Sequence, residues 1–118
     1  MKLIRSFKYA WAGMLACFKS EPNFRIHLVA AVGAILFSLL FKISAAEWIM
    51  IGFCIASVIT MEMINTAIEK LCDLVHKELH PAVKNIKDIT AGAVLLSAVF
   101  SLITAAIIFL PKIIMYFK

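Results

Sequence analysis

A run of 22 residues from Ile89 to Leu110 contains no charged side chain. With a rise of 1.5 Å per residue, an α-helix of this length crosses a hydrocarbon core of about 30 Å. The stretches 24–41 and 48–68 are also apolar enough to cross. Hydrophobic residues make up 64% of the chain and charged residues 16%, whereas soluble domains have about one half and one quarter. The sequence therefore predicts an all-α integral membrane protein with three spanning helices.

In the first twenty residues, apolar side chains recur at steps of three and four positions, as they do on one face of a helix. Lys or Arg occupies many of the gaps between apolar residues. The apolar positions are Leu3, Ile4, Phe7, Trp11, Met14, Leu15 and Phe18. A stripe of this kind with a basic opposite face is typical of an amphipathic helix that lies in the membrane interface. We expect such a surface helix at 1–20. We expect no removable signal peptide, because the segment lacks a compact apolar core with a small-residue cleavage site.

Three prolines mark the expected element boundaries. Pro22 predicts a break at 20–23, with Ser20 as a suitable cap. His80-Pro81 predicts a turn before the third span, and Pro111 is expected to end that span. A chain of 118 residues has room for one domain, so residues 1–118 are expected to form a single membrane-embedded unit. Any active site must then be built from the helices themselves.

The basic residues are distributed unevenly along the chain. Nine of the twelve precede the first span or lie between the second and third: Lys2, Arg5, Lys8, Lys19, Arg25, Lys70, Lys77, Lys84 and Lys87. The positive-inside rule places the N-terminus and the 70–88 loop in the cytoplasm. Topology and anionic lipid explain the net charge of +5 without any nucleic acid partner. The three cysteines, at 17, 54 and 72, are far apart and are expected to be small buried apolar residues.

Four polar residues, Glu62, Asn65, Glu69 and Asp73, are separated by three, four and four positions. On a helix these spacings place all four along one narrow stripe. Glu62 is the most informative, because an acidic residue within a spanning helix is costly and indicates function by default. Stacked carboxylates repel one another, so they must share protons, meet a basic group or hold a divalent cation. Alternatively, Glu62 pairs with a basic group, while Glu69 and Asp73 are ordinary solvated residues at a helix end.

A second polar cluster, Lys84, Lys87 and Asp88, precedes the third span. The two lysines are one turn apart and could face a phosphate together, while Asp88 could cap the helix of the third span. A basic flank with a helix cap explains the same residues equally well from their spacing. Glycine-rich nucleotide motifs are absent, and the spacing of His76 and His80 does not match a zinc protease motif.

The chain resembles the bacterial diacylglycerol kinase family at Glu62-Met-Ile-Asn65-Thr-Ala-Ile-Glu69, then at Asp73, Lys87-Asp88 and Ala91-Gly92-Ala93-Val94. The match extends to Tyr9-Ala-Trp11-Ala-Gly13 and to Glu21-Pro-Asn-Phe24-Arg25, so it covers nearly the whole chain in the same order. The resemblance implies a surface helix and three spanning helices, assembled as a homotrimeric helical bundle in the bacterial inner or plasma membrane. It also implies the activity of a lipid kinase that uses ATP and Mg²⁺.

The resemblance further implies a role for each matching residue. Glu62 stands at the position of the catalytic base, which takes the proton of the lipid hydroxyl as this attacks the γ-phosphorus of ATP. Glu21 and Glu69 stand where the family holds magnesium, and Asn65 and Ala91 fall on the lipid-substrate side of the site. Positions that contact the nucleotide are matched by Tyr9, Glu21, Glu69, Glu78, Leu79, His80, Lys87 and Asp88.

Departures from the diacylglycerol-specific branch bear on the substrate. Lys2 occupies about the place of an Arg that contacts the nucleotide in that branch, with Arg5 close by to substitute for it. Ala91 falls where that branch has a Ser, and the segments His80-Pro81 and Lys87-Asp88 look more like the undecaprenol kinase branch. The resemblance thus favours undecaprenol as the lipid alcohol, with diacylglycerol as the alternative.

Two other classes of protein also fit parts of the pattern. In a small proton-coupled transporter, Glu62 would bind the coupling proton instead of acting as a base. Small multidrug transporters usually have four spans with the acidic residue in the first, whereas this sequence predicts three spans with the acid in the second. The remaining alternative is an assembly or scaffold protein without either activity.

Overall fold

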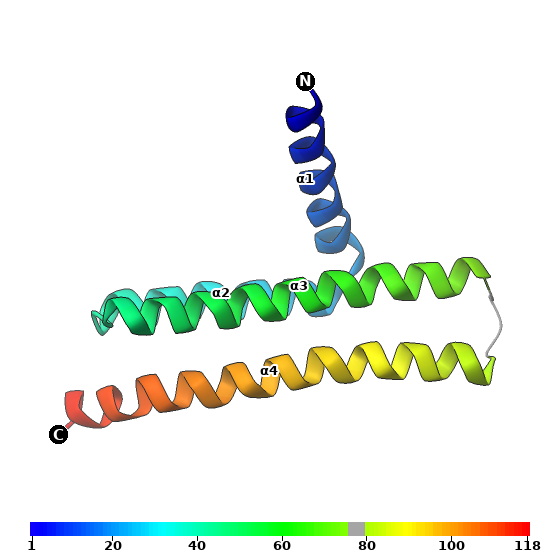
Figure 1. Ribbon diagram of the computed structural model, residues 1–118. Helices are drawn as coiled ribbons and strands as arrows, with labels where there is room; N and C mark the ends of the chain where they lie inside the picture. Colours follow the sequence, from blue (N-terminus) through cyan, green and yellow to red (C-terminus); the bar gives the residue numbers. More distant parts are fainter. Residues whose placement is uncertain (76–79) are drawn as a thin grey trace.

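The computed structural model describes residues 1–75 and 80–118. Its helices are α1 (Lys2–Ser20), α2 (Pro22–Leu40), α3 (Ala45–Val75) and α4 (Pro81–Tyr116). Within the described ranges, α2, α3 and α4 are the helices long and apolar enough to cross a membrane. Figure 1 shows these three running alongside one another, while α1 leaves the bundle across their direction. The prediction of an all-α chain with one separate N-terminal helix and three spans is confirmed.

The junction between α1 and α2 consists of a single extended residue, Glu21, with φ −119° and ψ 108°. Pro22 follows as the first residue of α2, where its missing N–H costs no hydrogen bond. The Arg25 guanidinium donates from Nη1 to the Phe18 carbonyl at 2.7 Å, which satisfies a carbonyl at the end of α1. The break is therefore narrower than the predicted 20–23. Ser20 belongs to α1, and its hydroxyl donates back to the Ala16 carbonyl.

The start of α3 is fixed by a reciprocal capping box. The Ser44 backbone N–H donates to Glu47 Oε1 at 2.9 Å, and the Glu47 N–H donates to Ser44 Oγ at 3.2 Å. Lys112 of α4 donates from Nζ to Glu47 Oε2 at 2.9 Å. The same carboxylate thus caps one spanning helix and ties it to another.

The start and end of α4 differ from the sequence-based expectation. The helix begins at Pro81, with His80 as its N-cap, so Asp88 lies in its second turn and does not cap it. The prediction that Pro111 ends the helix is also wrong, because α4 continues to Tyr116. Proline removes one N–H and disturbs one turn, but neighbouring helices and local adjustments make this tolerable in spanning helices.

The well-packed core lies at the end of the bundle opposite α1. Ile43, Ile51, Ile108 and Phe109 form a buried cluster there, against which Phe41 and Trp48 pack. At the other end, α3 runs past the α1–α2 junction toward residues 76–79 (Figure 1). Polar side chains are concentrated on this stretch of α3.

Candidate functional site

Glu62 is an ionisable residue of α3 whose side chain is buried inside the helical bundle. It is 4% exposed and lies on the face of α3 that also buries Val58 and Thr66, one turn before and one turn after it. Burial on one face follows from the helical repeat, since positions four apart share that face. The Thr66 hydroxyl donates to the Glu62 backbone carbonyl at 2.9 Å. An acidic side chain in this position needs a partner, because burying an isolated carboxylate is very costly.

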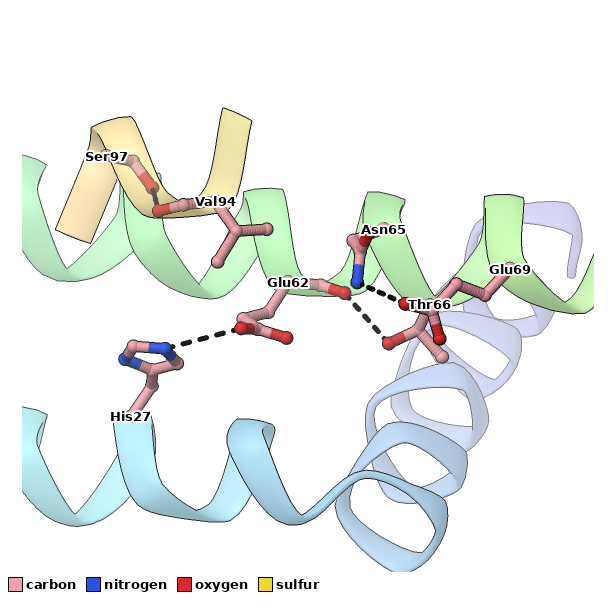
Figure 2. Close-up of polar contacts among 7 residues, drawn as sticks. All are labelled: His27, Glu62, Asn65, Thr66, Glu69, Val94 and Ser97. Atoms are coloured by element: carbon pink, nitrogen blue, oxygen red, sulfur yellow. Dashed lines mark hydrogen bonds and ion pairs between the residues drawn. The ribbon is translucent and has the colours of Figure 1, made fainter. Parts of the chain in front are cut away.

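The partner of Glu62 is His27 of α2. Its Nε2 atom lies 3.3 Å from Glu62 Oε1, and Figure 2 shows the imidazole and the carboxylate pointing toward each other across the two helices. Pairing of Glu62 with a basic group was one of the alternatives that the sequence left open, but His27 was not predicted as the partner. Its signal was present, however, because an ionisable residue occurs in each of two consecutive apolar segments, where such residues usually pair with one another.

One turn further along α3, Asn65 holds Glu69. The Asn65 side-chain N–H donates to Glu69 Oε1 at 2.9 Å, an i, i+4 contact visible in Figure 2. The other polar atom of this amide, Oδ1, is buried and has no hydrogen-bond partner in the described part of the chain. A buried acceptor left open in this way is available to a polar group of a bound molecule.

The negative charges of Glu21 and Glu69 both lie close enough to repel the Glu62 carboxylate. The repulsion on Glu62 thus comes from a residue at the α1–α2 junction and from a residue of its own helix. Across residues 1–75 and 80–118, no three His, Cys, Asp or Glu side chains converge on one point. Magnesium in phosphate-transferring sites is usually held by one or two carboxylates plus the substrate phosphates. Glu21 and Glu69 are carboxylates, the residue type that this mode of binding uses.

Both lysines of the basic cluster before the third span form ion pairs. Lys87 pairs with Asp73 of α3 at 2.7 Å, and Lys84 pairs with Asp88 within α4, also at 2.7 Å. The two lysines thus have different acidic partners, and a joint contact with one phosphate stays a prediction. The Lys87–Asp73 pair instead joins the end of α3 to the start of α4.

The other predicted site residues lie on α1, at the start of α4 and just before it. Tyr9 is on α1 with a 70% exposed side chain, and Ala91 is exposed on α4. His80 caps α4, with its Nδ1 accepting from the Ala82 N–H at 3.1 Å. Glu78 and Leu79 lie outside the described residues.

The sequence matches the family model described as prokaryotic diacylglycerol kinase over residues 8–109. The chain belongs to the prokaryotic diacylglycerol kinase family. Its relatives include an undecaprenol kinase from Bacillus subtilis, 38% identical over 95% of this chain and 91% of the relative. A diacylglycerol kinase from Synechocystis is 37% identical, over 94% of this chain and 64% of the relative. Another diacylglycerol kinase, from Pseudomonas aeruginosa, is 34% identical over 92% of this chain and 89% of the relative.

Membership of the diacylglycerol kinase family makes the protein a lipid kinase. Such an enzyme takes a phosphoryl group from a nucleotide and places it on a membrane lipid, so it requires both a nucleotide donor and membrane association. Three apolar helices provide the membrane part. The family also decides against the transporter and scaffold alternatives.

Proposed function

We propose that the protein transfers the γ-phosphoryl group of ATP to the hydroxyl of undecaprenol, with Glu62 as general base. The observation that carries this proposal is the buried carboxylate of Glu62, which sits in a spanning helix beside two further carboxylates. Ordinary packing does not require this costly arrangement. A phosphorylation site at the edge of the membrane does require a base that a lipid hydroxyl can reach.

In the proposed step, the lipid oxygen attacks the γ-phosphorus while the Glu62 carboxylate takes the hydroxyl proton. A bond forms between the lipid oxygen and phosphorus, and the bond from phosphorus to the β–γ bridging oxygen breaks. ADP leaves with the electron pair of that bond, and the lipid becomes a phosphate monoester. Phosphoryl transfer of this kind depends mainly on positioning and on neutralising charge. It therefore does not need a glycine-rich loop.

Glu21 and Glu69 are the residues that would hold a magnesium ion, which supplies neutralisation of phosphate charge when bound. The hydrogen bond from Asn65 fixes the Glu69 carboxylate for this purpose. Asn65 Oδ1 is buried without a hydrogen-bond partner among the described residues, and we propose that it accepts a hydrogen bond when the substrates are bound. Of the residues proposed to contact nucleotide, Lys87 is paired with Asp73 and has further N–H donors for a phosphate. The others are Tyr9, Glu78, Leu79, His80 and Asp88, and Ala91 is proposed to lie on the lipid side.

Two features support undecaprenol over diacylglycerol as the lipid alcohol. The first is the relative named undecaprenol kinase, whose 38% identity slightly exceeds the 37% and 34% of the two diacylglycerol kinases. The second is Ala91, at a position where the diacylglycerol branch has a Ser. We also propose a homotrimer in the bacterial cell membrane, because three spans of one chain cannot easily surround several acidic side chains.

The proposal is tested by incubating the purified protein with ATP, MgCl₂ and either undecaprenol or diacylglycerol in mixed micelles, with labelled phosphate followed into the lipid fraction. We expect both ATP and Mg²⁺ to be required, and undecaprenol to be phosphorylated with the higher kcat/KM. Preference for diacylglycerol would overturn the substrate assignment alone. Absence of labelled lipid with either alcohol would overturn the proposed reaction.

A further inference from the structure

We propose that His27 is a positioning residue, which holds the Glu62 carboxylate so that one oxygen remains free to take the lipid proton. This inference rests on the proposed role of Glu62 as base. It adds a residue of α2 to the proposed site, whose other residues lie on or beside the other three helices.

The geometry of the pair carries the proposal. Nε2 of His27 approaches only Oε1 of Glu62, at 3.3 Å, and no described residue donates a hydrogen bond to Oε2. A carboxylate that is held at one oxygen has a restricted plane and rotamer, while its second oxygen stays available to accept a proton. A distance of 3.3 Å is at the long end for an N–H···O contact, and such contacts commonly tighten when substrates bind.

The charges around Glu62 explain why such a partner is needed. Of the described residues that act electrostatically on Glu62, Glu21 at the α1–α2 junction and Glu69 on α3 are acidic. His27 on α2 is the only one of these that can carry positive charge. A buried base between two anions is poorly held as a carboxylate unless a donor faces it.

The exposure of the two side chains differs in a way that suits this role. The His27 side chain is 24% exposed and that of Glu62 is 5% exposed. The imidazole therefore reaches the edge of the bundle, whereas the carboxylate that it faces is enclosed.

A purely structural tie between α2 and α3 would give different kinetics, so the test separates the two roles. We compare His27→Leu, which removes the donor at similar volume, with His27→Gln, which keeps an N–H donor that does not titrate. Thr66→Val is the matched control, because it deletes a buried hydrogen bond to the Glu62 backbone without touching the carboxylate. Each variant is assayed for lipid phosphorylation per folded protein, with folding followed by thermal unfolding in micelles.

We expect His27→Leu to lower kcat by about 10- to 100-fold with the KM for ATP nearly unchanged, as for a misplaced catalytic group. His27→Gln should recover much of kcat, because its amide N–H can replace the imidazole as the donor to the Glu62 carboxylate. On a Glu62→Gln background, His27→Leu should have no further effect, because the two residues act as one unit.

Unchanged kcat in His27→Leu, with an active wild type, would overturn the role of His27 and leave the proposed function intact. Inactivity of the wild type toward both lipids would instead overturn the proposed function. Should His27→Leu fail to fold, His27→Gln still decides: a fall in kcat caused by His27→Gln that persists in full on the Glu62→Gln background would contradict the proposal. A fall in kcat equal to that of Thr66→Val would also do so.

Discussion

Glu62 combines two properties that rarely occur together in a spanning helix, full burial and a charge. An acidic residue at such a position costs about 2.5 to 3.5 kcal/mol on insertion scales. The structure reduces that cost by placing His27 at 3.3 Å, but it also places the charges of Glu21 and Glu69 nearby. A carboxylate kept for structure alone would be better placed without them. These surroundings therefore fit a carboxylate that is kept for function.

Replacing Glu62 by Gln tests the base directly. The amide has the shape of the acid and removes the proton acceptor, so turnover should fall by roughly 10² to 10⁴, the usual contribution of general base catalysis. Binding of ATP should be retained, because Glu21 and Glu69 remain. Steady-state kinetics and equilibrium binding of ATP measure the two effects separately. Undiminished phosphorylation by the variant would remove Glu62 as the base even though the family assignment stands.

Replacing Glu69 by Gln should have a different kinetic signature. We expect weaker binding of ATP in the presence of Mg²⁺ and partial recovery of activity as MgCl₂ is raised, because a cation ligand has been weakened. Glu62→Gln is the matched control and should not respond to MgCl₂ in this way. Titrations of MgCl₂ at fixed ATP provide the measurement. Equal responses of the two variants would contradict the separation of roles along α3.

The sequence predicted that the acidic stripe lies on one continuous helix, but it did not predict the partner of Glu62. Glu62, Asn65 and Glu69 fall on one stripe because the helical repeat alone fixes their spacing, and α3 is indeed continuous through all of them. The pairing of Glu62 with His27 depends instead on how α2 packs against α3. Sequence spacing within one helix carries no information on that packing, so His27 was missed.

At the scale of whole elements, the long helices extend beyond the apolar runs from which they were predicted. The described α3 and α4 have 31 and 36 residues, whereas about 20 suffice to cross the hydrocarbon core. Hydropathy identifies the segment that crosses the lipid but does not locate the helix ends. A helix can continue beyond the apolar run where its residues favour helix and its side chains find partners. The Lys87–Asp73 and Lys84–Asp88 pairs lie in these extensions. This is why Asp88 is in a helix turn and not at its cap.

The capping box of α3 leads to a prediction at this scale. Glu47→Ala removes both the acceptor for the Ser44 N–H and the partner of Lys112, so the midpoint of thermal unfolding in micelles should fall by a few degrees. Glu47→Gln keeps an acceptor for Ser44 but loses the charge pair, and should lie between Glu47→Ala and the wild type. Lys84→Ala breaks an exposed pair and serves as the control, with little change expected. A midpoint for Glu47→Ala equal to that control would contradict the role of the capping box.

The whole molecule is shaped for lipid on most of its surface. Many large apolar side chains are exposed along α2, α3 and α4, including Val29, Phe53, Leu96 and Ile107. In water this surface would aggregate, whereas in a bilayer it is solvated by acyl chains or covered by other subunits. The starts of α2 and α4 and the end of α3 lie toward the same end of the bundle (Figure 1). That end carries most of the basic residues and the carboxylates of the proposed site.

The orientation of the chain in the membrane follows from this distribution of charge. The positive-inside rule predicts that α1 and the start of α4 face the cytoplasm and that residue 118 lies outside. We first change Cys17, Cys54 and Cys72 to Ala. Single cysteines are then introduced as Lys2→Cys, Lys84→Cys or Lys118→Cys, and each reports on which side of the membrane its position lies. With a membrane-impermeant maleimide on intact cells, only the cysteine at position 118 should react, and those at 2 and 84 should react after permeabilisation. Retained lipid kinase activity provides the control for folding. Labelling of position 2 from outside would place Glu21 and Glu69 on the side away from cytoplasmic ATP, and the proposed reaction would then lack its phosphoryl donor.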